Sequence, residues 1–307
     1  MADTYPLLTI ALCTFNGAAH LREQLDSYLK QRDANWRLWV SDDGSSDATR
    51  KILDDFFVRH SGHHEVRIID GPKKGVAANF LSLLCHPEFP AGPVAISDQD
   101  DVWLDHKLSR AHLQMKGVPG PVIYGAQSLH VDAELLPFGR SGTVSSRPGF
   151  NNALVQNMIS GHSCVLSAEA LTLVRRAGVP QGVPYHDWWL YLLVTGAGGR
   201  ALVDDDAVLL YRQHGDNLMG ANSGMRARFT RARQVLASEY SGWMAANTTA
   251  LANCSQLLNA EARQALQDFR QPARGLGRVS QLRRLGVARQ GRIGTTCLYV
   301  AAALGKV

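Results

Sequence analysis

The sequence lacks the cysteine spacing of a disulfide-rich or zinc-binding protein. Five cysteines are scattered along the chain, none of them forms a C-x-x-C pair, and their number is odd. Disulfide frameworks and structural zinc sites both need paired, closely spaced cysteines. The scattered thiols argue against either kind of site and predict a protein of the reducing cytoplasm.

Segments for membrane insertion or secretion are also missing. The longest apolar stretch, at residues 294–305, is too short to cross a bilayer. The first residues include Asp3 and lead straight into an apolar run, without a basic leader or a cleavage site. We therefore expect neither a transmembrane helix nor a secretory signal.

Two common phosphate-binding motifs are absent as well. No G-x-G-x-x-G follows the first predicted strand, and no G-K-[ST] occurs anywhere in the chain. Both motifs hold phosphates with backbone amides where a glycine-rich turn enters a helix. Their absence removes the main support for a dinucleotide-binding or P-loop protein.

What the sequence does contain is enough apolar residues for a core, and an uneven distribution of charge. Its 307 residues are 45% hydrophobic and 19% charged, with a net charge of +5. Residues 1–225 carry 19 Lys and Arg against 24 Asp and Glu, whereas residues 226–307 carry 13 against 3. Residues 220–224, G-A-N-S-G, have the composition of a linker. We predict a main domain at 1–220 and a basic, mostly helical segment at 221–307. Such a segment can contact an anionic membrane, contact nucleic acid or pack on the main domain.

Apolar runs alternate with helical patterns through the first hundred residues. Short apolar runs predict strands at residues 7–15, 37–41, 66–69 and 94–97. Apolar residues at helical spacing predict helices at residues 19–31, 46–59 and 76–85. This alternation is typical of an α/β fold with a mostly parallel sheet flanked by helices, in which ligands bind at the carboxyl ends of the strands.

Three carboxylates follow the fourth predicted strand, at Asp98, Asp100 and Asp101. Like charges this close repel one another, which raises their pKa values and costs stability unless a partner is present. A divalent cation removes the conflict, and Mg²⁺ or Mn²⁺ is typically held by one or two carboxylates together with substrate phosphates. The alternative is a solvated acidic turn. The position at a strand end, where two other polar loops converge, favours the cation.

Six pieces of the sequence, in their order and spacing, resemble the family 2 glycosyltransferases, which have the GT-A fold. They are T-F-N-G at Thr14–Gly17, D-D-G-S-S-D at Asp42–Asp47, G-x-x-x-N at Gly75–Asn79, D-Q-D-D-V-W at Asp98–Trp103, H-D-W-W at His186–Trp189 and Y-R-Q-H-G-D-N at Tyr211–Asn217. The fourth and sixth pieces together resemble the bacterial rhamnosyltransferase-like branch, which builds surface polysaccharides from dTDP-L-rhamnose. The resemblance implies a catalytic domain with a nucleotide-binding half at about 1–103 and an acceptor half at about 104–220.

The resemblance also implies which residues bind the nucleotide. Thr14, Phe15 and Asn16 are expected to line the pocket for the base and the ribose. Asp42 is expected to accept the imide N–H of uracil or thymine, a task that suits a carboxylate because it only accepts hydrogen bonds. Asn79 is expected to contribute to the same nucleotide site.

The aspartate loop and a histidine match the metal-binding region of the family. Asp98 is assigned to the ribose, and Asp100 and Asp101 to a Mg²⁺ or Mn²⁺ ion, although any of the three is a candidate for direct contact. His214 matches a position that adds a contact to the metal or the diphosphate. The alternative for His214 is a structural histidine at the end of a strand.

The catalytic carboxylate of the family lies in an E-D pair at the start of a helix, and this chain has His186-Asp187 there. Asp187 is therefore the predicted base, and a helix N-terminus favours its ionised form. The alternative is that Asp187 only caps the helix. His162, His186 and Trp188 are predicted to contact the acceptor, the tryptophan by stacking on a sugar. The alternative for His162 is a structural histidine, and the alternative for His186 is that it tunes Asp187.

These assignments predict an inverting, divalent-metal-dependent glycosyltransferase. The donor is expected to be dTDP-L-rhamnose, or otherwise a UDP-sugar, and the acceptor a hydroxyl of a glycan or lipid-linked glycan. The basic segment is expected to contact the inner face of the cell membrane. A catalytically inactive nucleotide-sugar-binding protein is the alternative, since it would not need Asp187. Aromatic residues are sparse among the C-terminal arginines, so we expect no nucleic acid partner.

Overall fold

One mixed sheet runs through the centre of the molecule. The computed structural model describes residues 6–32, 35–144, 148–213 and 238–307. Within these ranges nine strands form a sheet of order β3-β2-β1-β4-β8-β6-β9-β5, with β7 paired to β6. The strands are β1 (Leu7–Thr14), β2 (Asn35–Asp42), β3 (Val66–Asp70), β4 (Val94–Ser97), β5 (Val102–Trp103), β6 (Val122–Val131), β7 (Pro137–Arg140), β8 (Val165–Leu166) and β9 (Arg200–Arg212).

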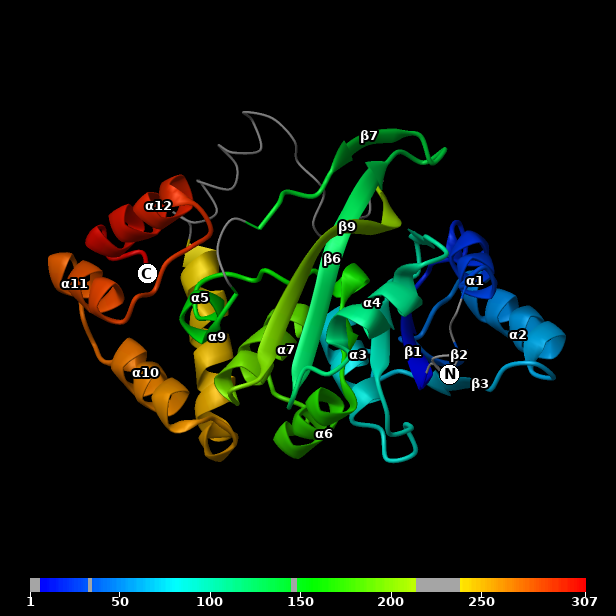
Figure 1. Ribbon diagram of the computed structural model, residues 1–307, viewed down its shortest axis with the longest axis horizontal. Helices are drawn as coiled ribbons and strands as arrows, with labels where there is room; N and C mark the ends of the chain where they lie inside the picture. Colours follow the sequence, from blue (N-terminus) through cyan, green and yellow to red (C-terminus); the bar gives the residue numbers. More distant parts are fainter. Residues whose placement is uncertain (1–5, 33–34, 145–147, 214–237) are drawn as a thin grey trace.

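Some of the helices flank this sheet, and others form a separate group at one end of the molecule (Figure 1). Helices α1 and α2 lie at the end that carries β3, and α10, α11 and α12 lie at the opposite end (Figure 1). The helices are α1 (Leu21–Leu29), α2 (Thr49–His60), α3 (Val76–Leu84), α4 (Lys107–Met115), α5 (Phe150–Ala153), α6 (Ala168–Ala177), α7 (His186–Gly196), α9 (Ser238–Asn253), α10 (Ala260–Arg270), α11 (Leu276–Arg284) and α12 (Arg292–Ala303), with 3₁₀ turns η1 (Gly161–Ser163) and η2 (Ser255–Leu257).

The predicted α/β fold is confirmed, and the parallel sheet is confined to its first half. β3, β2, β1 and β4 are parallel neighbours, as the alternation of strands and helices indicates. Beyond them β8 is antiparallel to both β4 and β6, and β5 is antiparallel to β9. The second half is therefore mixed, because its strands are not joined by regular strand–helix–strand crossovers.

Alternating side chains of the strands build a core on each face of the sheet. On β1, Leu8, Ile10 and Leu12 pack with α1, α2 and α4, whereas Ala11 and Cys13 face the opposite side with α3, α6 and α7. This is the two-residue period of a strand buried on both faces. The long strands β6 and β9 run side by side through the centre (Figure 1).

The parallel register aligns the polar residues that follow the strands. Thr14 pairs with Asp42, and Asp42 pairs with Asp70, so three polar strand ends lie in a row. Ser97, at the end of β4, pairs with Leu12 of the neighbouring strand β1. The loops after β1, β2 and β4 therefore start from one edge of the sheet, the carboxyl edge.

The C-terminal helices share a core with the rest of the molecule. Tyr240, Leu251 and Leu298 belong to the same buried cluster as Trp188 and Trp189 of α7. The predicted boundary at 220–221 lies outside the described residues. Within the described ranges, no helix is both long and apolar enough to cross a membrane.

Polar contacts also fasten the C-terminal helices to the region around α5. The side-chain amide of Asn151 donates to the Leu285 carbonyl at 2.8 Å, and that of Asn152 donates to the Ala288 carbonyl at 2.9 Å. The Arg289 guanidinium donates to the Val155 carbonyl at 3.1 Å. Part of the basic charge thus serves internal packing.

Candidate active site

The loop after β2 is built around the carboxylate of Asp42. Its Oδ1 accepts hydrogen bonds from the hydroxyls of Thr14, at 2.8 Å, and Ser45, at 2.5 Å, and its Oδ2 accepts the Ser45 amide at 3.0 Å. A carboxylate has about four acceptor positions. Three are used here, which leaves one on Oδ2 for a further donor. Asp42 itself is 5% exposed.

Asn79 supports this loop from behind. Its side-chain amide bonds twice to Ser41, donating to the carbonyl at 3.0 Å and accepting the hydroxyl at 2.6 Å, and the residue is 1% exposed. The predicted direct contact with a nucleotide does not fit this position, because the side chain is buried and bonded to β2. We correct its role to holding the end of β2 against α3.

The loop after β1 is tied to the loops after β2 and β4. The Phe15 amide donates to Gln99 Oε1 at 2.8 Å, and Gln99 Nε2 donates back to the Phe15 carbonyl at 3.0 Å. Asn16 has a left-handed backbone, with φ of 48°, and its Oδ1 accepts the Ser46 amide at 2.8 Å. The Phe15 side chain is left 56% exposed beside this junction.

A group of potential metal ligands lies just beyond β4. One ligand atom each from Asp98, Asp101 and His162 lies within 4.8 Å of the others, the one such group in the part of the chain that the structure describes. Asp101 is 1% exposed, and its Oδ2 has no hydrogen-bond partner among the described residues. A buried carboxylate oxygen without a donor is costly, which is the situation that a cation relieves. Asp100 does not belong to this group.

Two cationic side chains hold the aspartate loop in place. Arg212, 1% exposed at the end of β9, donates its backbone N–H to Asp101 Oδ1 at 3.3 Å and its Nε to the Asp100 carbonyl at 3.1 Å. Its guanidinium also contacts Glu23 of α1. Lys107 is fully buried, donates to the His162 carbonyl at 2.5 Å and lies 3.6 Å above the Trp103 ring.

Burial and mutual repulsion raise the pKa values of the carboxylates in this group. Burial, followed by the charges of Asp100 and Asp187, raises the pKa of Asp98 to about 7. Burial and the charge of Asp100 also raise the pKa of Asp101 well above its usual range. Burial lowers the pKa of Lys107 to about 7, although Asp101 and Asp98 act against the shift. The positive charge of Lys107 therefore offsets only part of the negative charge of Asp98 and Asp101.

Asp187 meets this group from the start of α7. It is the one residue of α7 that is not buried. Its Oδ2 accepts the Gly161 amide at 3.0 Å, and its Oδ1 accepts the Trp188 amide at 2.7 Å. A Cβ at Gly161 would lie 2.8 Å from His186 Nε2, so a glycine permits this close approach. Through its bond to Gly161, Asp187 is next to His162 of the acidic group, and its charge contributes to the raised pKa of Asp98.

The predicted acceptor residues occupy three different environments. His162 lies with the acids, half-buried and stacked on Tyr211 at 4.6 Å between ring centroids. His186 is 7% exposed and stacked on Phe80 at 4.1 Å. Trp188 is 3% exposed, and its indole N–H donates to the Ala153 carbonyl at 2.7 Å. The predicted stacking of Trp188 on a sugar is corrected, because its ring is enclosed in the core.

Three residues of the site were not predicted from the sequence, and one predicted residue is not placed. Lys107, Arg212 and Gln99 are the unpredicted ones. Arg212 and Gln99 stand inside motifs that the sequence displays, Y-R-Q-H and D-Q-D-D, and those positions were the available signal. The sequence carried no signal for Lys107, because its contact is with His162, which is far along the chain. His214 lies outside the described residues.

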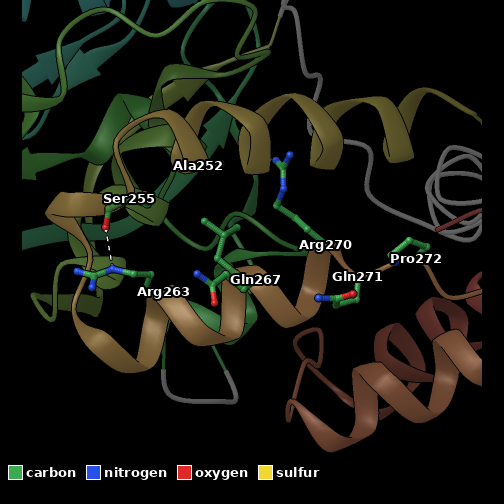
Figure 2. A pocket seen from close by; sticks show the side chains of 8 residues that line it. Ala252, Ser255, Arg263, Gln267, Arg270, Gln271 and Pro272 are labelled. Atoms are coloured by element: carbon green, nitrogen blue, oxygen red, sulfur yellow. Dashed lines mark hydrogen bonds between the residues drawn. The ribbon is translucent and has the colours of Figure 1, made fainter.

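A separate pocket lies between the end of α9 and α10 (Figure 2). It has a volume of about 350 Å³ and contains two arginines, Arg263 and Arg270, but no carboxylate or histidine among the described residues that line it. Arg263 Nε donates to the Ser255 carbonyl at 3.2 Å. With no metal ligand and no base, this pocket does not compete with the carboxyl edge as a catalytic centre.

Sequence comparison relates the first half of the chain to one enzyme family. Residues 9–134 match the family described as Glycosyl transferase family 2. The chain is also 27% identical over 232 residues to the dTDP-rhamnosyl transferase RfbG of Shigella flexneri, in an alignment that covers 72% of this chain and 77% of that relative.

Solved structures show the same fold. The mannosyltransferase PcManGT from Pyrobaculum calidifontis, in complex with GDP-Man and Mn²⁺, superposes with a TM-score of 0.54 at 17% identity, covering 99% of this chain and 88% of that one. S. aureus TarS 1-349 in complex with UDP-GlcNAc gives a TM-score of 0.53 at 14% identity, covering 91% of this chain and 90% of that one. At such identities the likeness concerns the fold.

Proposed function

This chain is a glycosyltransferase with a family 2 domain of the GT-A fold, and from that premise we propose that it transfers a sugar from a nucleotide diphosphate to an acceptor hydroxyl with inversion at the anomeric carbon. The observation that carries the proposal is the group of Asp98, Asp101 and His162 after β4, next to Asp187, which accepts the Gly161 amide and alone among α7 residues is not buried.

The nucleotide is assigned to the loops after β1 and β2. The remaining acceptor position on Asp42 Oδ2 suits the imide N–H of thymine or uracil, which lies between two carbonyls. Thr14 and Ser45 orient that carboxylate. The exposed ring of Phe15 and the backbone of Asn16 border the same loop, in the position proposed for the base and the ribose.

The acidic group fits a divalent cation. The observation is the buried, unpartnered Oδ2 of Asp101 next to a second carboxylate whose pKa is raised. Asp98 and Asp101 are the proposed carboxylate ligands, and Asp100, next to them on the loop, remains a proposed ligand from the sequence motif. His214 remains a proposed ligand from the sequence motif. When bound, the ion would offset the negative charge that develops on the departing diphosphate.

Asp187 is the proposed base. It would take the proton from the acceptor hydroxyl as that oxygen attacks the anomeric carbon and the bond to the diphosphate breaks. The Gly161 and Trp188 amides hold its two oxygens in place. His186, adjacent in sequence, is buried against Phe80, so it is proposed to tune Asp187 instead of contacting the acceptor. No covalent intermediate is needed for a single displacement.

The proposed donor is dTDP-L-rhamnose. The support is the similarity to a relative named as a dTDP-rhamnosyl transferase, which extends over 72% of this chain. A UDP-sugar is the second choice, since the Asp42 pocket accepts the imide of uracil as readily as that of thymine. The acceptor is proposed to be a glycan or lipid-linked glycan of a bacterial surface polysaccharide.

Peripheral contact with an anionic membrane is proposed for the C-terminal helices. Along α12, Ile293, Val300 and Leu304 are 78%, 50% and 63% exposed, at spacings that place them on one helix face. Arg283, Arg284 and Arg292 are exposed nearby in sequence. Apolar side chains beside basic ones are the combination that binds a lipid surface without spanning it.

A donor screen tests the proposed function. The full-length protein is incubated with dTDP-L-rhamnose, UDP-glucose, UDP-GlcNAc and GDP-mannose, each with and without Mn²⁺ or Mg²⁺, and thermal shift and donor hydrolysis are recorded. We expect the dTDP-sugar to give the largest shift, and the metal to increase both readouts. GDP-mannose serves as the mismatched base, because guanine presents a different hydrogen-bonding edge to Asp42.

The outcomes separate the candidate functions. Stabilisation by a nucleotide sugar without turnover on any acceptor would favour the inactive binding protein. No stabilisation by any of the four donors, with or without metal, would contradict the assignment of the nucleotide site.

A further inference from the structure

We propose that His162 is a nitrogen ligand of the metal ion, beside Asp98 and Asp101, and that it makes the site prefer Mn²⁺ to Mg²⁺. The inference rests on the proposed function. It gives His162 a contact with the metal in place of the acceptor contact that the sequence predicted. It follows from the position of the imidazole among the acids and from the contacts that fix it there.

The distances suit shared coordination. The three ligand atoms lie within 4.8 Å of one another. In an octahedral site with metal–ligand bonds of about 2.1 Å, opposite ligands are about 4.2 Å apart. Adjacent ligands in such a site are about 3.0 Å apart, so the imidazole and the two carboxylates would move closer together by up to about 1.8 Å to share an ion.

One carboxylate oxygen of the group, Oδ2 of Asp101, lacks a hydrogen-bond donor among the described residues. Asp101 Oδ1 accepts the Arg212 amide at 3.3 Å, but Oδ2 has no partner among the described residues although Asp101 is only 1% exposed. Buried polar atoms in native proteins are nearly always satisfied. A ligand that binds Asp101 at this point lies within reach of the His162 ring.

His162 is also held in one orientation by contacts unrelated to an acceptor. Its carbonyl accepts the Lys107 ammonium at 2.5 Å, and its ring stacks on Tyr211 with 21° between the ring planes. The preceding residue, Gly161, is bonded through its amide to Asp187 Oδ2. A ligand whose orientation is set before the metal arrives loses little freedom on binding.

A nitrogen ligand has consequences for the choice of metal. Mg²⁺ is a hard ion that takes oxygen ligands and retains several waters, whereas imidazole favours first-row transition ions. A site of two carboxylates and one imidazole therefore binds Mn²⁺ more tightly than Mg²⁺. A site of carboxylates alone would discriminate less between the two ions.

The alternative is that His162 only packs against Tyr211 and Lys107. In that case the metal is held by oxygen atoms alone, and removing the imidazole leaves metal affinity unchanged. The two possibilities differ in an observable that does not involve turnover.

Mn²⁺ binding to the full-length protein, without nucleotide, is measured by electron paramagnetic resonance. Free Mn²⁺ gives the affinity, Mg²⁺ competition gives the selectivity, and electron spin-echo modulation detects ¹⁴N coupled to bound Mn²⁺. The variants are His162→Ala, His162→Gln, which offers an amide oxygen, and Asp101→Asn. His63→Ala removes an exposed histidine of the α2–β3 loop and serves as the matched control. Circular dichroism confirms folding of each variant.

We expect ¹⁴N modulation in the wild type and in His63→Ala, and its loss in both His162 variants. Mn²⁺ affinity should fall by about tenfold or more in His162→Ala, and His162→Gln should lose the preference for Mn²⁺ over Mg²⁺. Wild-type affinity and modulation in both His162 variants, with loss of binding in Asp101→Asn, would overturn the role of His162 and leave the metal-dependent transferase standing. Unchanged binding in all three would overturn both.

Discussion

At the scale of single residues, Asp187 is the one residue of helix α7 that is not buried. The rest of α7 is enclosed, because its side chains are apolar on every side. Asp187 lies in the first turn, where free backbone amides favour a negative charge. Its bonds to Gly161 and Trp188 are also those that a helix cap would make. Only a substitution that keeps those bonds can separate the two roles.

Asp187→Asn is the informative change, because an amide oxygen can still accept from the Gly161 amide but cannot take a proton. We expect donor binding near that of the wild type and turnover lower by about 10²-fold or more. Isothermal titration with the donor and initial rates on an acceptor measure the two effects. Asp70→Asn is the control, since Asp70 ends β3 on the same edge and its side chain is 84% exposed. Turnover within about threefold of the wild type would leave Asp187 as a helix cap.

At the scale of elements, β9 contacts α4, β6 and the aspartate loop. Its Asp204, 9% exposed, accepts two hydrogen bonds from Arg110 of α4, at 2.7 and 2.9 Å, and one from the Tyr124 hydroxyl of β6, at 2.9 Å. Eight residues further along the same strand, Arg212 anchors Asp101. The buried Asp204 pair and the contact with Asp101 are therefore carried by one strand.

Asp204→Asn should lower the free energy of unfolding by about 1–3 kcal/mol at pH 7, since it weakens buried charge-assisted hydrogen bonds. Burial raises the pKa of Asp204, but its hydrogen bonds, led by that from Arg110, outweigh burial, so the folded pKa lies below the usual 3.8. The stabilisation is thus complete above that pH and is lost as the pH falls through the folded pKa. Urea unfolding of wild type and variant at pH 7 and at acidic pH measures the difference, which should shrink in acid.

Asp206→Asn is a matched control for this prediction. Asp206 pairs with the same arginine at 2.7 Å, but its side chain is 56% exposed, so its loss should cost less than about 1 kcal/mol. Equal destabilisation by both variants would contradict the central role of the buried pair.

At the scale of the whole molecule, the C-terminal helices are part of the structural core and also belong to the basic part of the sequence. Leu251 and Leu298 are fully buried with α7, and Arg289 bonds to Val155. Removing the segment would therefore expose the core of the catalytic domain. A truncation cannot test membrane contact, and surface substitutions in the full chain are needed.

The variant Ile293→Ser/Val300→Ser/Leu304→Ser should lose affinity for anionic vesicles by at least about tenfold. Tenfold is a lower bound, because each aliphatic side chain contributes about 1.5–3 kcal/mol when fully buried, and tenfold corresponds to about 1.4 kcal/mol. Co-sedimentation with phosphatidylcholine vesicles, with and without phosphatidylserine, measures it. Val58→Ser on α2, at a residue 77% exposed, is the control. Equal partitioning of the wild type to both kinds of vesicle would leave these helices with a packing role.

The sequence by itself determined the first four strands, the helices between them and the edge at which the polar loops meet. Those features follow from local periodicity and from the rule that parallel strands end together. Thr14, Asp42 and Asp98 could therefore be placed on one edge from the pattern of the chain alone, and Asp187 followed from the family motif.

Only the tertiary structure decided which side chains face the site and which face the core. It buried Trp188, bonded Asn79 to Ser41 and set His162 among the acids. It also joined the basic segment to the main core. These outcomes depend on contacts between residues far apart in the chain, such as Lys107 with His162. The local sequence pattern does not predict these contacts, because the direction of a side chain depends on the residues that pack against it.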